Sequence, residues 1–490
     1  AASWELVEPE EGRFRFDEVD AMIDSATDAG VKLIILWFGS WKNGQSTYVP
    51  EWVKKDTGRF PRALFSDGQT TSTLSALGKN SMKADAKAFA AMMAHVRDYD
   101  RNGTVIMVQV ENEIGTLDMM SSFMGGENRA ARDYSPAARK AFAGKVPEKL
   151  LSYLSATKGS LHPAIEGAWK RGGYRTSGSW EEVFGKGDLV LKDGSWQDTY
   201  PSITEEIFNT WNYATYVDFV ASEGKKQYDI PMFVNAWLKQ ANQAAPGKYP
   251  SGGPNAHMFD IWRAGAPSID FYAADIYATD IFDWVCSSFK GSGNPLFIPE
   301  TKTTPDGASR AFYTFGKYAP LCYSPFGIDG GGLMNSADVN DHSFDISYAL
   351  LSRHVDEIRS HTPAAGRNGD AVTLGGYTFS ISPTNFSSFA AVAGVDAHGS
   401  TSAGATDVSG VLVIQRGEGE FLVLGGVGAC SLRVSSADGS FSEILSVDEI
   451  RKDSQGNNYL HRLNGDETSM GAASFRGGQA QAFIVKMHKL

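Results

Sequence analysis

The sequence predicts an α/β protein in which residues 1–361 form a (βα)₈ TIM barrel and residues 362–490 form an antiparallel β-sandwich. In the first region, short apolar runs alternate with amphipathic segments, which is typical of parallel strands joined by helices. In the second region, short segments of alternating polarity are separated by Gly, Asp and Asn, which indicates antiparallel strands and turns. No glycine-rich phosphate loop follows an early strand, so an open doubly wound sheet of six strands is the less favoured alternative.

Six apolar runs of strand length occur in the predicted barrel: residues 31–38, 104–110, 231–237, 269–276, 295–299 and 321–328. They alternate with predicted helices, of which the clearest are 17–30, 81–98, 202–223 and a closing helix at 344–360. Asp17 can cap the first of these helices, and Gly30 ends it. Ser202 and Glu205 have the spacing of a capping box, and the helix that they open is predicted to stop before Gly224.

A closed barrel of this class needs eight strands, and six complete ones are found. Ser3 and Trp4 have the character of a strand's tail, and the absent strands would precede residues 31–38. We therefore expect an N-terminally incomplete form of a longer protein, which lacks its first strand and most of its second. A chain that begins at Ala1 is then expected to express poorly or aggregate, and roughly 50 to 80 upstream residues are expected to restore a soluble enzyme.

Two further regions are predicted around this framework. Residues 116–201 are far longer than a usual strand-to-helix connection, so we expect an insertion that forms a wall beside the first candidate carboxylate. Strands of the sandwich are predicted at 377–382, 410–415, 420–424 and 481–486. No carboxylate cluster stands out in the sandwich, and a packing or substrate-rim module is its predicted role.

Composition excludes several classes of partner. The 490 residues carry a net charge of −12 and no Lys/Arg run longer than two, so no nucleic-acid partner is predicted. A neutral carbohydrate suits the 11 Trp and 18 Tyr, because aromatic rings stack on sugars. No run of 18 apolar residues predicts a membrane span. The three Cys and nine His lack metal-ligand spacing, so no metal or cofactor is predicted.

Glu113 and Glu300 are the candidate catalytic residues, because each lies at the end of a predicted strand. Asn112 and Glu113 close the strand at 104–110, and Glu300 follows the run at 295–299. Chemistry in such barrels is done at the carboxyl ends of the strands. When the two absent strands are counted, Glu113 lies on the fourth strand and Glu300 on the seventh, and these two strands face each other across the mouth of the barrel. Carboxyl groups about 5 to 5.5 Å apart support retention, whereas inverting glycosidases need about 6.5 to 9.5 Å. The pair therefore predicts a retaining glycosidase.

Three features together resemble family 35 of the glycoside hydrolases, the β-galactosidases of the retaining (βα)₈ clan: WELVEPEEGRFRFD at residues 4–17, ENEIG at 111–115 and Glu300 at a strand end. The segments LWFGSWKNG and YVPEWVK, at 36–44 and 48–54, are similar to a bacterial branch whose barrel carries a C-terminal β-sandwich. The resemblance covers the whole chain. It implies that Glu113 is the proton donor and Glu300 the nucleophile, and that the protein works outside the cytoplasm, in the periplasm or secreted.

Six residues are predicted to bind substrate: Asn112, Trp41, Asn43, Asn235, Trp237 and Tyr277. The Asn112 amide suits a hydrogen bond to a sugar 2-hydroxyl, with a strand-end turn cap as the alternative. Tyr277 resembles the tyrosine that, in this clan, donates to the nucleophile and would keep Glu300 ionised, with a core tyrosine as the alternative. The other four suit stacking on galactose or hydrogen bonding to it, with structural packing as the alternative.

Two more glutamates are close to the candidate site in sequence. Glu111 lies two residues before Glu113 and on the same side of the strand, so it either binds substrate or is ion-paired deeper in the barrel. Glu8, followed by Pro9, resembles a residue of the family motif and is predicted to form a structural corner between strand and helix.

The function predicted from these residues and the resemblance is retaining exo-hydrolysis of terminal β-galactosides, with plant-polysaccharide side chains as a candidate source. Another specificity of the same clan, such as a β-glucosidase or an arabinopyranosidase-like activity, remains open because pocket residues decide it. A non-catalytic carbohydrate-binding barrel is the alternative from a different class of protein.

Overall fold

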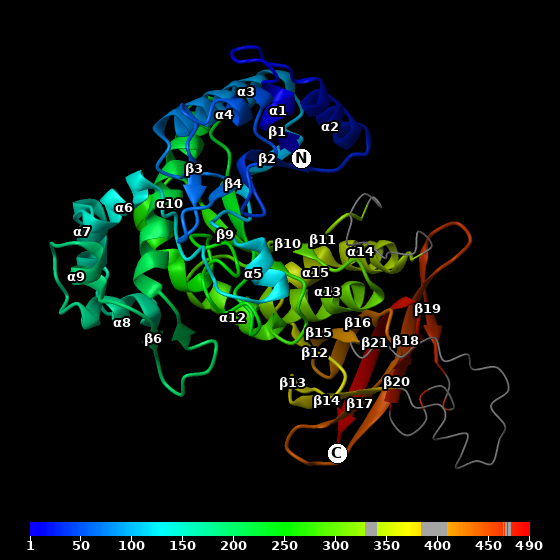
Figure 1. Cartoon of the computed structure of the whole chain (residues 1–490). Helices are drawn as coiled ribbons and strands as arrows, with labels where there is room; N and C mark the ends of the chain where they lie inside the picture. Colours follow the sequence, from blue (N-terminus) through cyan, green and yellow to red (C-terminus); the bar gives the residue numbers. More distant parts are fainter. Residues whose placement is uncertain (329–340, 384–408, 464, 466–467, 469–471) are drawn as a thin grey trace. The chain divides into compact units, whose positions relative to one another are not determined.

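The structure is a computed structural model that describes residues 1–328, 341–383, 409–463, 465, 468 and 472–490. The chain forms two compact units, residues 1–297 and 298–490 (Figure 1). Within the described ranges, no helix is both long and apolar enough to cross a membrane.

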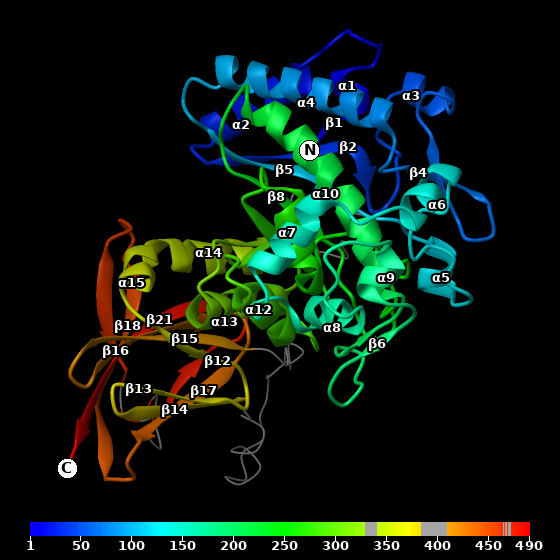
Figure 2. The same cartoon turned by 90° about the vertical axis from the view of Figure 1, so that its left-hand side faces the viewer.

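A curled parallel sheet of seven strands forms the centre of the α/β region, as in a half-barrel (Figure 2). Its order is β1 (Ala2–Ser3), β2 (Leu33–Lys42), β5 (Val105–Asn112), β8 (Met232–Ala236), β9 (Phe271–Ile276), β10 (Phe297–Thr301) and β11 (Cys322–Pro325). The strands from β1 to β9 pair in parallel, each with its neighbour in this order. All six predicted strands exist, and β1 has two residues where the tail of a strand was predicted. An eighth strand of this sheet is not found among the described residues.

Helices α4 (Lys79–Tyr99) and α10 (Ile203–Lys225) pack side by side and contact the sheet (Figures 1 and 2). Gly224, where α10 was predicted to stop, lies inside this helix. A Cβ atom at Gly224 would overlap the ring of Phe89 on α4, so the close approach of the two helices requires glycine here. The packing thereby outweighs the cost of about 1 kcal/mol for an internal helical glycine.

The remaining helices of this region connect strands: α1 (Trp4–Val7), α2 (Asp17–Asp28), α3 (Glu51–Lys55), α11 (Phe259–Gly265), α12 (Phe282–Gly291) and α13 (Pro305–Tyr318). A short hairpin of β3 (Arg62–Leu64) and β4 (Thr70–Leu74) lies between α3 and α4 in the chain, and the 3₁₀ helix η1 (Ala256–Met258) precedes α11.

Three predicted helix features differ from the structure. Ser202 has a left-handed φ of 46° and makes no side-chain hydrogen bond to the helix, so the predicted capping box is wrong. Asp17 is the first helical residue of α2 and does not precede the helix as a cap. The predicted closing helix is divided at His354 into α14 (Ser343–Arg353) and α15 (Val355–Ser360).

The predicted insertion after β5 contains five short helices and one hairpin. These are α5 (Met119–Met124), α6 (Pro136–Ala143), α7 (Glu148–Ala156), α8 (Pro163–Arg171), α9 (Trp180–Phe184), β6 (Leu189–Val190) and β7 (Thr199–Tyr200). Helices α8 and α9 contact each other and lie close together in Figure 1. Proline at the first turn of α6 and α8 is typical of helix starts, because its missing N–H has no partner there in any case.

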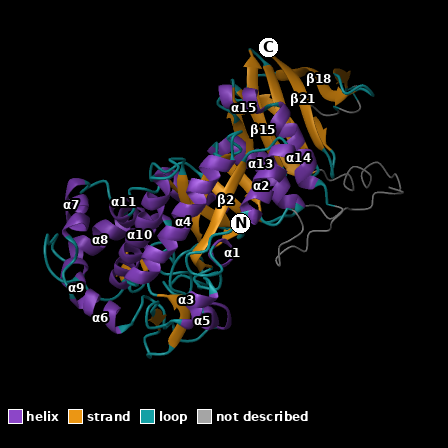
Figure 3. Cartoon of the chain, turned by 90° about the horizontal axis from the view of Figure 1, so that it is seen from above, coloured by secondary structure: helices purple, strands orange, loops and turns teal. Residues whose placement is uncertain are grey.

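The last part of the chain is rich in antiparallel strands. One sheet has the order β12 (Ala364–Gly366), β15 (Gly410–Gly417), β16 (Glu420–Gly426), β21 (Ala480–Lys489), β18 (Ser442–Lys452) and β19 (Asn458–Arg462). A second sheet has the order β13 (Ala371–Leu374), β14 (Tyr377–Pro383), β17 (Cys430–Ser436) and β20 (Ala472–Phe475). Strands β18 and β21 lie side by side in Figure 3. Alternate residues of both sheets, such as Phe379 and Phe421, form one buried apolar cluster.

Candidate active site

The end of β5 is held against the end of β2 by hydrogen bonds. The Asn43 amide donates to the Asn112 carbonyl at 3.2 Å, and the Gly44 amide donates to the Glu113 carbonyl at 3.0 Å. The Lys42 ammonium donates to the side-chain oxygen of Asn112 at 3.2 Å. Glu113 leaves the strand with a φ of 45°, in the left-handed region that residues other than glycine seldom adopt. Its backbone position is therefore determined by these neighbours.

Asn235, in β8, links Glu113 to a carboxylate on the next strand. Its side-chain oxygen accepts a hydrogen bond from the Glu113 backbone amide at 2.9 Å. Its side-chain nitrogen donates to Asp275 Oδ2, in β9, at 2.7 Å. Because a carboxylate only accepts hydrogen bonds, this second contact fixes which way the carboxamide points. All three side chains are buried.

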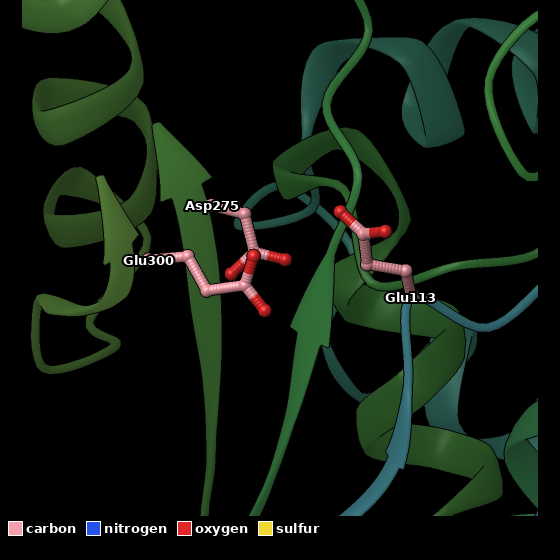
Figure 4. Close-up of side chains that lie close together, drawn as sticks. All are labelled: Glu113, Asp275 and Glu300. Atoms are coloured by element: carbon pink, nitrogen blue, oxygen red, sulfur yellow. The ribbon is translucent and has the colours of Figure 1, made fainter. Parts of the chain in front are cut away.

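Three carboxyl groups meet where β5, β9 and β10 end (Figure 4). Glu113, Asp275 and Glu300 each offer an oxygen, and these oxygens lie within 4.8 Å of one another. Acidic side chains this close can bind a divalent cation, but an acidic cluster alone does not identify such a site, and we assign none to it.

Asp275 was not predicted as a site residue, and neither was Lys42. The one signal for Asp275 in the sequence is a carboxylate inside the apolar run 269–276, two residues before Tyr277. Period-two alternation places residues 275 and 277 on the same side of an extended chain, so the signal was present. Glu300 was predicted to follow its strand, but β10 extends to Thr301, so Glu300 lies within it.

A second carboxyl pair lies further back along β5. Glu111 accepts hydrogen bonds from the Ser40 amide at 3.1 Å and from the Trp41 amide at 2.7 Å. Asp85, on α4, accepts from the Trp37 indole at 2.9 Å and from the Ser40 hydroxyl at 2.6 Å. Both carboxyl groups are completely buried. Glu111 is therefore bound to backbone amides and not to a basic partner, and it does not reach the surface to bind substrate.

Burial and the neighbouring Asp85 carboxylate raise the pKa of Glu111 well above its usual range. Burial also raises the pKa of Asp85, but hydrogen bonds from Glu111, Ser40 and Trp37 act against this rise. Glu111 is thus the protonated member of the pair and donates its proton to Asp85. Neutralisation of one member makes the burial of two carboxyl groups tolerable.

Gly39 is required for this arrangement. A Cβ atom at Gly39 would lie 2.7 Å from both Asp85 Oδ1 and Glu111 Oε1, and closer still to the Trp37 indole nitrogen. None of these three side chains is a flexible surface group, because each is buried. The glycine in the segment LWFGSWKNG therefore makes room for the carboxyl pair.

The predicted sugar-stacking residues have different surroundings. Trp41 is completely buried, donates to the Leu74 carbonyl at 3.1 Å and packs edge-on against Tyr213 and Tyr216, which fits structural packing. Trp237 is half-buried after β8 and contacts the ring of Phe123 on α5, with centroids 5.7 Å apart.

The other predicted residues lie near these elements. Asn43 has a left-handed φ of 52° and accepts a hydrogen bond from Lys42 at 2.9 Å. Tyr277 is half-buried directly after β9. Glu8 is buried and accepts from the Trp4 indole at 2.9 Å and from the Gly12 amide at 2.7 Å, as a structural corner would.

Comparison with known proteins gives two partial family matches. Residues 1–140 match the model of glycoside hydrolase family 42, described as β-galactosidase. Residues 348–474 match a domain of unknown function, DUF5597. No curated protein matches. The first match supports a glycoside hydrolase, and the resemblance to family 35 in particular stays a prediction.

Several solved structures are similar to this chain at low identity. The β-galactosidase from Bacillus circulans sp. alkalophilus is 15% identical with a TM-score of 0.37, over 62% of this chain and 39% of that protein. Xylanase 10C from Cellvibrio japonicus, in complex with xylopentaose, is 12% identical with a TM-score of 0.31, over 62% and 40%. An agarase is 15% identical with a TM-score of 0.27, over 57% and 33%. The chain spans less than half the length of these three proteins, and we draw no functional conclusion from superpositions at such TM-scores.

Proposed function

We propose that this protein is a retaining exo-glycosidase that hydrolyses terminal β-galactosides. The observation that carries the proposal is the proximity of the Glu113 and Glu300 carboxyl groups, whose oxygens lie within 4.8 Å, at the ends of two strands of one parallel sheet. Retaining glycosidases have their two carboxyl groups roughly 5 to 5.5 Å apart, whereas inverting ones need about 6.5 to 9.5 Å, so this proximity supports retention in the proposal.

In the proposed reaction, a Glu300 oxygen attacks the anomeric carbon while Glu113 gives its proton to the leaving oxygen. The glycosidic bond breaks, the alcohol leaves and the sugar is bound to Glu300 as an ester. Glu113, now a carboxylate, then takes a proton from water as the water oxygen attacks the same carbon. The Glu300 ester bond breaks, and both carboxyl groups return to their starting states with the anomeric configuration retained.

Neighbouring side chains have positioning roles in this proposal. Asn235 holds the Glu113 backbone amide at 2.9 Å, and Asp275 holds the Asn235 carboxamide at 2.7 Å. Asn112, whose side-chain oxygen is fixed by Lys42 at 3.2 Å, would bind the sugar 2-hydroxyl. Tyr277 would donate to Glu300 and favour its ionised form.

The choice of galactose is supported by the β-galactosidase match of residues 1–140 and by the resemblance of residues 4–17 and 111–115. A panel of aryl β-glycosides tests it directly. We expect the β-galactoside to be cleaved with the largest kcat/KM, because the contacts to the sugar hydroxyls decide specificity. A larger kcat/KM for the β-glucoside or the arabinopyranoside would show that the enzyme prefers that sugar to galactose.

Substitution of the nucleophile tests the mechanism. Glu300→Ala should reduce the turnover of an aryl β-galactoside by about 10⁴ or more, because no glycosyl-enzyme can form, and azide or formate should restore turnover. Glu418→Ala is a matched control, since Glu418 is exposed in the turn between β15 and β16. The mechanism is refuted if Glu300→Ala keeps more than a tenth of the wild-type kcat.

A further inference from the structure

A cavity of about 180 Å³ lies in the first unit, beside the loop that follows β8. Five structural elements contribute to its wall: the start of α8, the β6–β7 hairpin, the loop after β8, η1 and α12. The lining residues used below are His162, Lys192, Tyr200, Lys239 and Trp284. None of them was singled out by the sequence, and none belongs to the carboxyl cluster described above.

Lys239 is the most unusual of these residues. Its side chain is buried, with 2% of the residue exposed, and its ammonium donates to the Thr199 carbonyl at 2.6 Å. It also lies over the Tyr200 ring, 4.1 Å from the centroid. No carboxylate of the described residues lies within 4.0 Å of this ammonium. An ammonium has three donors, so two of them have no protein acceptor in the described part of the chain.

Glu206 is the buried carboxylate whose charge acts most strongly on Lys239, and it already has two hydrogen-bond donors. It accepts from the Tyr249 hydroxyl at 2.6 Å and from His257 Nε2 at 3.1 Å. Burial lowers the pKa of Lys239 to about 8, although the charges of Glu206 and of Asp198, which also lines the cavity, favour its protonated form. Burial of a cation without an ion-pair partner is costly, which is the usual reason for such a depressed pKa.

The cavity is lined by further donors and by one carboxylate, that of Asp198. His162 Nδ1 accepts from the Ala164 amide at 3.1 Å, and burial lowers the pKa of His162 to about 3, so this ring is neutral and carries its proton on Nε2. The Tyr200 hydroxyl makes no hydrogen bond within the described residues. Lys192 is exposed at the rim, where Asp198 lies 4.0 Å from it.

We propose that this cavity binds the carboxylate of an acidic sugar residue, with Lys239 as its ion-pair partner and His162 and Tyr200 as further donors. An anion with several acceptor oxygens satisfies the donors that have no acceptor among the described residues, and Trp284, which packs edge-on against Trp196, adds an aromatic side chain to the lining. Pockets for drug-sized ligands measure about 300 to 1,000 Å³, so this smaller cavity suits a single sugar residue. Since Lys239 follows Asn235 by four residues, the site would recognise an acidic neighbour of the sugar that is cleaved.

The proposal rests on the carbohydrate substrate of the proposed function, but a binding assay tests it separately. Calorimetry on the full chain should show that galacturonate binds at least ten times more tightly than galactose. Lys239→Met should remove this preference, and Lys186→Met, which changes an exposed lysine, should keep it. Galactose 6-sulfate is included because a sulfate ester offers similar oxygens; a preference for it over galacturonate would overturn the assignment to a carboxylate.

Two further measurements cover the case in which Lys239→Met fails to fold. Tyr200→Phe removes one proposed donor and should weaken galacturonate binding several-fold without changing galactose binding. In the unaltered protein, galacturonate binding should weaken as the pH rises through about 8, because Lys239 loses its charge there. Equal binding of galacturonate and galactose, or galacturonate binding that Lys239→Met leaves intact, refutes the site. Failure of aryl galactoside hydrolysis would refute the proposed function and leave this binding result unchanged.

Discussion

Two glutamates on one strand, separated by a single residue, have opposite surroundings. Glu111 is enclosed between β2 and α4, where it accepts from two backbone amides and shares a proton with Asp85. Glu113 lies just past the strand end, where its carboxyl group is close to those of Asp275 and Glu300. The same residue type therefore supports the fold at one position and, in our proposal, chemistry at the other. The difference comes from the neighbours that each position meets, and the backbone contributes to it: φ is 64° at Glu111 and 45° at Glu113, so the regular alternation of an extended strand does not hold here.

The comparison is tested most strongly at Glu113. Glu113→Ala should lower the cleavage of galactosides with poor leaving groups by about 10² to 10⁴, because these need a proton donor. Activated aryl galactosides should still form the glycosyl-enzyme at a nearly normal rate. Pre-steady-state kinetics on both substrate types measures the difference. Equal losses on the two types would remove Glu113 from the acid/base role.

Gly39→Ala tests the packing around Glu111. The added methyl group would collide with the Trp37 indole and with both carboxyl groups, so we expect a loss of about 3 kcal/mol in the free energy of unfolding, measured with urea. Gly291→Ala, at the end of α12, is the control, because a Cβ there meets no atom within 4 Å. If the two variants are equally stable, the carboxyl pair is less constrained than its contacts indicate.

Glu111→Gln tests the shared proton through pH. The raised pKa means that the folded chain holds this proton more tightly than the unfolded chain does. The stability contribution is therefore complete below the unfolded pKa, about 4.3, and is lost as the pH rises toward the folded pKa. Above pH 4.3, wild-type stability should fall relative to Glu111→Gln by up to about 1.4 kcal/mol per pH unit. Glu18 is exposed, so the free energy of unfolding of Glu18→Gln should change with pH as that of the wild type does.

The smallest expected effect is at Tyr216. Its hydroxyl hydrogen-bonds to the Ser40 hydroxyl at 2.6 Å, and Ser40 in turn donates to Asp85. Tyr216→Phe should cost about 1 kcal/mol, because Ser40 keeps its bond to Asp85. Tyr213→Phe, which loses a bond to Thr116 at 3.1 Å, is the matched comparison. A loss of 3 kcal/mol or more only at Tyr216 would extend the proton-sharing group to this hydroxyl.

Local pattern was enough to predict the strands and the two glutamates of the proposed pair, because strand ends follow from apolar period and length. It was not enough for Asp85 and Asp275. Asp85 lies 26 residues before Glu111 in the chain, on the buried face of a helix, and only the packing of α4 against β2 brings the two together. The capping box at Ser202 was wrong because Ser202 has a left-handed backbone and its side chain makes no capping hydrogen bond.

Some features depended on contacts that no short pattern encodes. Gly224 predicts a helix end, but α10 continues to Lys225, and the glycine is needed because a Cβ atom there would overlap the ring of Phe89. The position of Trp41 near a strand end predicts stacking on a sugar, but its ring packs edge-on against Tyr213 and Tyr216 of α10. Lys239 gives no signal in the sequence, because its importance lies in its burial without a carboxylate within 4.0 Å among the described residues.

The left-handed backbone at Glu113 means that a substitution which stabilises the protein at this position would also remove its activity in our proposal. A residue with a side chain in this region costs on the order of 1 to 3 kcal/mol, whereas glycine adopts it at little cost. Glu113→Gly should therefore increase the free energy of unfolding and remove the proposed proton donor. A directed-evolution campaign that scores heat resistance alone would enrich such inactive variants, so each round would need a hydrolysis screen beside it.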